Sequence, residues 1–109
     1  MKELGIDRND SIYVKRKKIV AIVKGKKYNF KPSEIYEVVL SVIPFDSMCI
    51  IINTVDNTRI MVLSLHSMYE NLLYKDLKKI FPIDYSQVSL AENFYEKKIY
   101  LLYRKEMTT

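Results

Sequence analysis

The sequence has little cysteine, histidine or glycine, and each shortage excludes a class of protein. Its 109 residues include one cysteine, Cys49, and one histidine, His66. An internal disulfide needs two cysteines and a structural zinc site needs several Cys and His ligands, so neither is expected. With only 2 glycines, the chain has no glycine-rich loop to cradle phosphates. We therefore predict a chain without disulfide, metal or cofactor.

Long hydrophobic runs are also missing. No apolar run reaches the roughly 18 residues of a membrane span, and the first residues lack the core of a signal peptide. This pattern predicts a protein without a membrane span and with a cytoplasmic location. Hydrophobic residues make up 49% and charged residues 28%, which is typical of a folded globular chain. At this length we expect one domain over residues 1–109.

Positive charge is in excess, because 18 Lys and Arg stand against 13 Asp and Glu, a net charge of +5. A small chain with this surplus carries a positive field on some face, which predicts an acidic partner. Nucleic acid, an acidic protein and anionic lipid all fit that sign. Solvated lysines that protect exposed strand edges would fit it as well. The basic residues cluster at 15–18, 24–31, 78–79, 97–98 and 104–105.

Short stretches rich in β-branched and aromatic residues, separated by turn residues, predict a series of strands. Lys24-Gly25-Lys26-Lys27 is predicted as a turn, and Asp56-Asn57 fits a tight hairpin because it tolerates left-handed backbone angles. Pro32 interrupts the pattern because proline fixes its own backbone angle. The predicted strands cover residues 11–14, 19–23, 28–30, 35–42, 48–55 and 59–63.

One short amphipathic helix is predicted at about residues 67–81. Ser67 and Glu70 have the spacing of a capping box, apolar residues then recur every three or four positions, and Pro82 ends the helix. Residues 83–90 and 97–103 are predicted as two further strands, although apolar residues there also fit a helical face. The fold class is therefore mainly β, with antiparallel strands in a small elongated or barrel-like domain.

The order of these elements resembles that of the LytTR DNA-binding domain. Residues 33–37 read Ser-Glu-Ile-Tyr-Glu, residues 54–57 form a Thr-Val-Asp-Asn hairpin turn, and residues 64–72 carry the Ser-Leu and Leu-rich start of a helix. Phe81 and the segment 83–90 follow in the order that the family shows. The resemblance covers about residues 11–104 and rests mostly on apolar and turn positions.

The sequence also departs from the family at positions that would contact DNA. Asp84 stands where the family usually has histidine, Tyr85 where it has arginine or another polar residue, and Leu90 where it has asparagine. Ser86 is retained. A carboxylate at Asp84 would repel phosphate, so the resemblance supports the fold more firmly than the activity.

The resemblance implies contact with duplex DNA through loops, without catalysis, and hence a role in transcription regulation. It assigns the contacts to the loop from Ser41 to Ser47, to the Tyr85-Ser86 position and to the end of the chain near Arg104-Lys105. The basic cluster that contains Lys15 and Arg16 is added because of its charge. The DNA-binding residues expected in this way are Phe45, Ser47, Tyr85, Ser86, Arg104, Lys105, Lys15 and Arg16.

Catalysis has little support in this sequence. A lone histidine just before a helix is usually a surface or cap residue, and Cys49 lies in an apolar run where a buried, inert thiol is expected. Neither residue has a visible orienting partner, and no pair of carboxylates stands out. We therefore predict that the protein is not an enzyme.

Our leading hypothesis is a stand-alone, diverged LytTR-like DNA-binding protein that receives its signal from a separate protein. If it is a homodimer, two copies would address repeated half-sites. One alternative is a pleckstrin-homology-like β module that binds a protein or an acidic lipid, in which the helix would close the fold. Another is a LytTR-like remnant that no longer binds DNA. The LytTR hypothesis requires further strands from residue 83 to residue 103.

Overall fold

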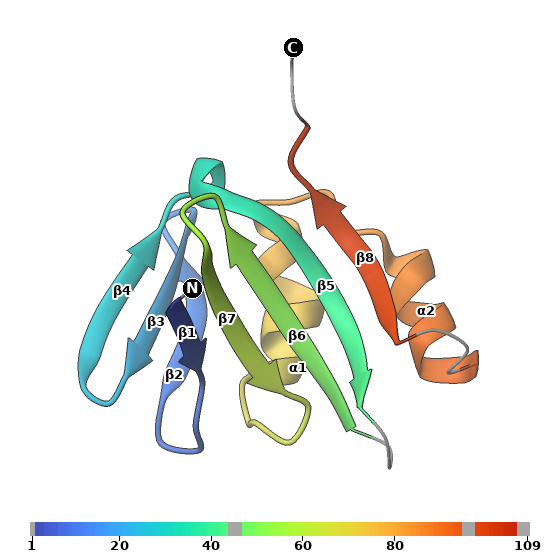
Figure 1. The fold of residues 1–109 in the computed structure, drawn as a ribbon, viewed down its shortest axis with the longest axis horizontal. Helices are drawn as coiled ribbons and strands as arrows, with labels where there is room; N and C mark the ends of the chain where they lie inside the picture. Colours follow the sequence, from blue (N-terminus) through green and yellow to red (C-terminus); the bar gives the residue numbers. More distant parts are fainter. Residues whose placement is uncertain (1, 44–46, 95–97, 107–109) are drawn as a thin grey trace.

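The computed structural model of the chain describes residues 2–43, 47–94 and 98–106 and places their strands in two sheets (Figure 1). The larger sheet has five strands in the order β1-β7-β6-β5-β8, in which β1 pairs with β7 in parallel and the other neighbours are antiparallel. Its strands are β1 (Lys2–Gly5), β5 (Ile35–Ile43), β6 (Ser47–Thr54), β7 (Thr58–Leu63) and β8 (Ile99–Arg104).

The smaller sheet is an antiparallel meander of three strands. It consists of β2 (Ser11–Lys15), β3 (Lys18–Val23) and β4 (Lys26–Phe30). The short helix η1 (Pro32–Glu34) then leads into β5 at the place where proline interrupts the sequence pattern. The six strands predicted up to residue 63 are thus confirmed, and the fold is mainly β.

The predicted amphipathic helix is confirmed as a helical segment from residue 69 to residue 79. It consists of α1 (Tyr69–Asn71), the wider turn η2 (Leu72–Asp76) and the tighter turn η3 (Leu77–Lys79). The predicted capping box is wrong, because no side chain caps α1. Instead the backbone N–H of Met68 donates to His66 Nδ1 at 3.0 Å, so the histidine stabilises the entry to the helix.

The strand predicted at residues 83–90 is wrong, because this segment forms the helix α2 (Tyr85–Phe94). Asp84 acts as its cap, since the backbone N–H of Ser86 donates to Asp84 Oδ1 at 3.1 Å. Val88 and Ala91, three residues apart, are both buried, which is the helical periodicity. The prediction of a strand here gave more weight to β-branched residues than to the helical spacing of the apolar residues. Strand β8 follows α2, so the segment contains one helix and one strand.

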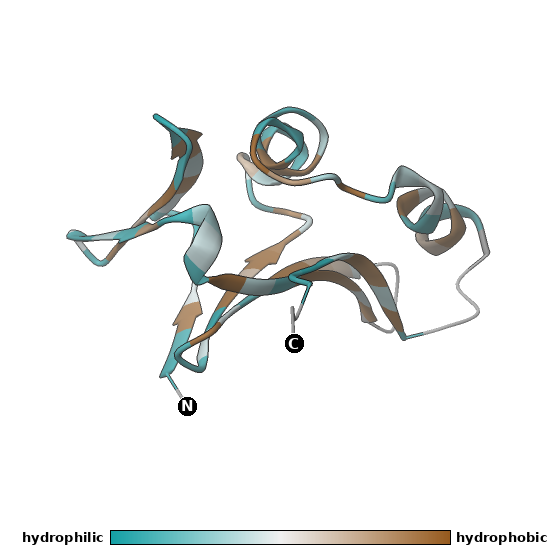
Figure 2. Cartoon of the chain, turned by 90° about the horizontal axis from the view of Figure 1, so that it is seen from above, coloured by the Kyte–Doolittle hydropathy of each residue, from teal (hydrophilic) through white to brown (hydrophobic). Residues whose placement is uncertain are grey.

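One hydrophobic core joins all of these elements. The inner sides of both sheets and the apolar sides of the helices meet in it, with Leu40, Ile50, Leu72 and Leu77 fully buried. Figure 2 shows the helices and the smaller sheet on the same side of the five-stranded sheet. Each sheet therefore has one face in the core and one face turned away from it.

Candidate nucleic-acid interface

The outer face of the smaller sheet collects basic side chains. Alternation along the strands sends Ile12, Ile19 and Phe30 into the core, so their sequence neighbours point outward. The register places Tyr13 beside Val20, Val20 beside Asn29, and Lys15 beside Lys18. Lys27 lies two residues before Asn29 on the same face.

These residues surround a shallow hollow of about 310 Å³, lined by Lys15, Arg16, Lys18, Val20, Lys27 and Asn29. The ion pairs found among the described residues join Lys79 to Asp76 and Arg104 to Glu37, so neither involves this hollow. The four cations here are exposed and have no acidic partner in the part of the chain that the structure describes. Such a hollow attracts an anion by Coulomb interaction and offers several N–H donors to it. We call these six lining residues together with Tyr13 the basic face.

The turn between β2 and β3 has an uncommon backbone for its residues. Arg16 has φ 52° and Lys17 has φ 62°, the left-handed region that asparagine and glycine occupy most easily. Two residues in this conformation match the twist of the flanking strands. Each non-glycine residue held in it lowers the stability of the fold by about 1–3 kcal/mol. Arg16 of the basic face and its neighbour Lys17 therefore stand at the tip of a strained turn. Asparagine or glycine would close the same hairpin with less backbone strain.

The β3–β4 turn of the smaller sheet is held by Asp10, which lies outside that sheet. The backbone N–H of Lys24 and the N–H of Asp7 each donate to one carboxylate oxygen of Asp10, both at 2.9 Å. These hydrogen bonds lower the pKa of Asp10 below its ordinary value. Gly25 completes the turn with φ 81°. Asp10 thereby ties the β3–β4 hairpin to the loop that follows β1.

Six of the eight predicted DNA-binding residues are not part of the basic face, and four of these six lie away from it or outside the described residues. Phe45 lies outside the described residues. Ser47 begins β6 and pairs with Ile43 at the far end of β5. Tyr85 donates its hydroxyl to the carbonyl of Leu73 at 2.8 Å, and its ring stacks on that of Tyr74 with centroids 6.2 Å apart. The Ser86 hydroxyl bonds to the carboxylate of Asp84.

The other four predicted residues lie at one end of the molecule. Lys15 and Arg16 belong to the basic face itself. Arg104 Nη2 lies 2.8 Å from Glu37 Oε1, and this carboxylate raises the pKa of the guanidinium. Lys105 Nζ donates to the carbonyl of Ser33 at 2.8 Å. The pairing of Ile19 with Phe30, just before η1, brings the β2–β3 turn to this same end.

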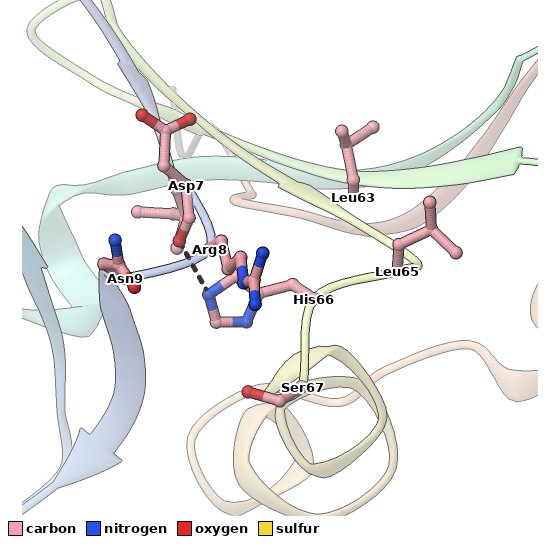
Figure 3. Close-up of a pocket in the computed structure, with 8 residues that line it drawn as sticks. Asp7, Arg8, Asn9, Leu63, Leu65, His66 and Ser67 are labelled. Atoms are coloured by element: carbon pink, nitrogen blue, oxygen red, sulfur yellow. Dashed lines mark hydrogen bonds between the residues drawn. The ribbon is translucent and has the colours of Figure 1, made fainter.

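His66 and Cys49 have structural surroundings. His66 Nδ1 accepts the N–H of Met68, so Nε2 carries the proton and donates to the carbonyls of Asp7 and Asp10 at 3.0 and 3.1 Å. His66 lines a hollow of about 600 Å³ between the β1–β2 and β7–α1 loops. Figure 3 shows its imidazole beside Asp7, Arg8 and Asn9. Both ring nitrogens are engaged by the backbone. Cys49 is buried, and burial raises the pKa of its thiol.

Among residues 2–43, 47–94 and 98–106, no group of three or more His, Cys, Asp or Glu is placed to hold a metal ion. In the same residues, no helix is long and apolar enough to cross a membrane. Family models, curated proteins and solved structures give no match to this chain. The arrangement of its own side chains is therefore what supports a functional proposal.

The residues of the basic face that the sequence did not single out are Tyr13, Lys18, Val20, Lys27 and Asn29. Their signal was present in the sequence as two basic clusters separated by an apolar strand. Assigning two-residue turns at Arg16-Lys17 and Lys24-Gly25 would have fixed the register, and the alternation would then have placed these side chains on one face.

Proposed function

We propose that the chain is a DNA-binding module that holds duplex DNA by its phosphates through the basic face and performs no chemistry. The observation that carries this proposal is a hollow with four cations and no acidic side chain in its lining. Lys and Arg contacts to phosphate release counterions and supply affinity that does not depend on sequence. The sequence resemblance to LytTR domains favours duplex DNA as the source of those phosphates, although β8 is the one strand that the described residues place between residues 83 and 103, where this hypothesis requires further strands.

Each part of the basic face has a role in this proposal. Lys15, Lys18 and Lys27 contact phosphates around the hollow, while Asn29 offers an amide for hydrogen bonding. Arg16 stands at the tip of the β2–β3 turn, where its planar guanidinium can enter a groove and donate two hydrogen bonds to a guanine edge. The strained backbone of this turn would then be retained for contact. A role in transcription, a cytoplasmic location and a separate signalling protein are parts of the same proposal.

The test is fluorescence anisotropy of the full chain with a random pool of duplexes at several salt concentrations, followed by sequencing of the retained duplexes. The variant Lys15→Ala/Lys18→Ala/Lys27→Ala is compared with Lys75→Ala/Lys78→Ala/Lys98→Ala, which removes the same charge from exposed positions elsewhere. Each phosphate that the first variant no longer neutralises should flatten the dependence of log affinity on log salt by about 0.9. The control variant should keep most of the wild-type slope.

Three results would contradict the proposal. Equal effects of the two triple variants would show that net charge, and not the basic face, governs binding. Absence of binding at low salt would favour a domain that does not bind DNA. Tight binding to vesicles that contain anionic lipid, together with weak binding to duplexes, would favour the pleckstrin-homology-like alternative.

A further inference from the structure

The five-stranded sheet has an outer face on which the described residues place no helix and no second sheet (Figure 2), although Val39 and Cys49 of this face are each only 5% exposed. Figure 2 shows α1, α2 and the smaller sheet on one side of this sheet only. Ile50, Ile52, Ile60 and Val62 point to that covered side and belong to the core. Their neighbours along β6 and β7 therefore point to the opposite side.

Strand pairing arranges the residues of this open face in rows that run across the sheet. The register joins Gly5 to Met61, Met61 to Ile51, Ile51 to Val39, and Val39 to Leu101. This row is apolar along its whole length. The next row contains Leu63, Cys49, Ser41 and Ile99. Leu63 is 48% exposed and Ile99 is 58% exposed, so the second row adds apolar surface at both sides.

A third row, on the other side of the apolar row, is polar and charged. The register joins Glu3 to Arg59, Arg59 to Asn53, Asn53 to Glu37, and Glu37 to Arg104. Neighbouring side chains of this row are joined by hydrogen bonds. Arg59 Nε donates to Asn53 Oδ1 at 3.2 Å, and Asn53 Nδ2 donates to Glu37 Oε2 at 2.8 Å. From one edge of the sheet to the other, the charges read negative, positive, neutral, negative, positive.

This order of charges is self-complementary under a two-fold rotation. An axis along β6, midway between two facing sheets, reverses the strand order and keeps each row opposite itself. Asn53 then faces its own copy, Arg59 faces Glu37, and Glu3 faces Arg104. Every charge of the row meets an opposite charge.

The apolar row fits the same axis. Ile51 faces its own copy and Met61 faces Val39. Gly5 faces Leu101, whose side chain is 38% exposed. No atom lies within 4 Å of the position where a Cβ of Gly5 would stand, so the glycine leaves open space for that leucine. In the charged row and the apolar row, polarity and charge therefore agree on one arrangement.

We infer that the open face of the five-stranded sheet is the interface of a two-fold homodimer, in which two copies pack sheet against sheet. The charged row sets the direction of the axis, because any rotation that places the charged row on the apolar rows would bury unpaired charges. Five strands spaced about 4.8 Å apart make a modest interface. The dimer is therefore expected to have a dissociation constant in the micromolar range or above, so that it forms only at high protein concentration.

The first test is sedimentation equilibrium of the full chain from micromolar to near-millimolar concentration. Ile51→Lys places two ammonium groups face to face on the axis, and we expect it to weaken the dimer by at least tenfold. The matched control is Leu65→Lys, which adds the same charge at a residue that is 89% exposed and lies outside the sheet. A wild-type chain that stays monomeric over the whole range, or equal effects of both variants, would overturn the inference.

The second test does not depend on tolerance of a buried charge. In a Cys49→Ala chain, Asn53→Cys places a thiol on the axis, and two packed sheets lie about 10 Å apart. A short bismaleimide should join two such chains covalently. Ser89→Cys, on an exposed position of α2 on the covered side of the sheet, should give no such product. Equal cross-linking at both positions, or none at residue 53 at near-millimolar concentration, would contradict a two-fold interface along β6.

Discussion

The two sheets share one core but turn very different faces away from it. The smaller sheet presents four cations around a hollow, with no acidic residue in the lining. The five-stranded sheet presents an apolar row beside a row whose charges balance. Both faces obey the same alternation of strand side chains, so the difference lies only in the residues at every second position.

This difference indicates two kinds of partner. An unbalanced positive surface favours a polyanion, whose binding weakens as salt rises. An apolar surface with paired charges favours a protein surface of the same pattern, and the pattern here matches its own copy. If both proposals hold, contact with DNA and contact with a second chain use separate faces of the molecule. Substitutions in the smaller sheet and in the residues that contact it test how far DNA binding depends on the basic face.

The largest effect is expected where the smaller sheet contacts the helical segment of residues 69–79. Asp76 is buried, and its Oδ2 accepts the backbone N–H of Val14 at 3.2 Å, which ties β2 to the helical segment. Asp76→Ala leaves that N–H without its acceptor and should lower the free energy of unfolding by about 1–3 kcal/mol, measured by urea denaturation. Asp76→Asn keeps an acceptor and should have a smaller effect. Equal stability of the alanine variant and the wild type would contradict this role.

A smaller effect of opposite sign is expected in the β2–β3 turn. Arg16→Asn/Lys17→Gly supplies residues that prefer the left-handed backbone, so it should raise the free energy of unfolding by about 1–2 kcal/mol. It also removes Arg16 from the basic face together with the neighbouring Lys17, so affinity for duplex DNA should fall. Thermal unfolding and anisotropy measure the two effects separately.

The control for this turn is Lys24→Asn, which gives the second hairpin an Asn-Gly turn. Lys24 also has a positive φ, of 52°, but it does not line the hollow. This variant should gain stability, and its affinity for DNA should fall less. An equal fall in affinity in both turn variants would show that the β2–β3 turn makes no special contact.

Tyr85 was predicted from the sequence to contact DNA, whereas the structure shows it packed against Tyr74 and hydrogen-bonded to Leu73. Tyr85→Phe removes the hydroxyl that donates to Leu73 and should lower the free energy of unfolding by about 0.5–1.5 kcal/mol. Affinity for DNA should not change, because the residue lies outside the basic face. A marked fall in DNA affinity with intact stability would instead restore Tyr85 as a residue that contacts DNA.

The smallest effect is expected at low pH, through Asp10. Two backbone N–H donors lower its pKa in the folded state, so the ionised carboxylate stabilises the fold above the ordinary Asp pKa of about 3.9. That stability is lost as the pH falls through the lowered folded-state pKa. Asp10→Asn should therefore be less stable than the wild type at pH 7, with a gap that narrows below pH 4. Parallel stability curves for the two proteins, measured by denaturation from pH 7 to pH 2, would contradict this.

Local patterns were enough to predict most of the strands. Pro32 interrupts the strands as expected, at the start of η1, and the turn at Asp56-Asn57 falls between β6 and β7, where Asn57 has φ 71°. The helix ending before Pro82 was also predicted. Strand β1 was missed because four residues give too short a pattern, and its parallel pairing with β7 depends on the tertiary fold. Helix α2 was missed because its cap, Asp84, was considered as a DNA contact and not as a helix start.

The candidate site was only partly predictable. Lys15 and Arg16 were expected from charge, but their grouping with Lys27 and Asn29 depends on the pairing of three strands. The self-complementary charged row of the five-stranded sheet was even less predictable from the sequence. It joins Glu3 to Arg104 across nearly the whole chain, and only the strand order β1-β7-β6-β5-β8 brings those residues into line.

The most direct measurement of the central claim is an NMR titration of the ¹⁵N-labelled chain with a short duplex. Separate faces predict that the largest amide shifts occur at residues 13–18 and at Lys27 and Asn29, while Ile51 and Met61 shift little. The largest shifts at the open face of the five-stranded sheet, or at Tyr85 and Ser86, would contradict the assignment of DNA binding to the basic face.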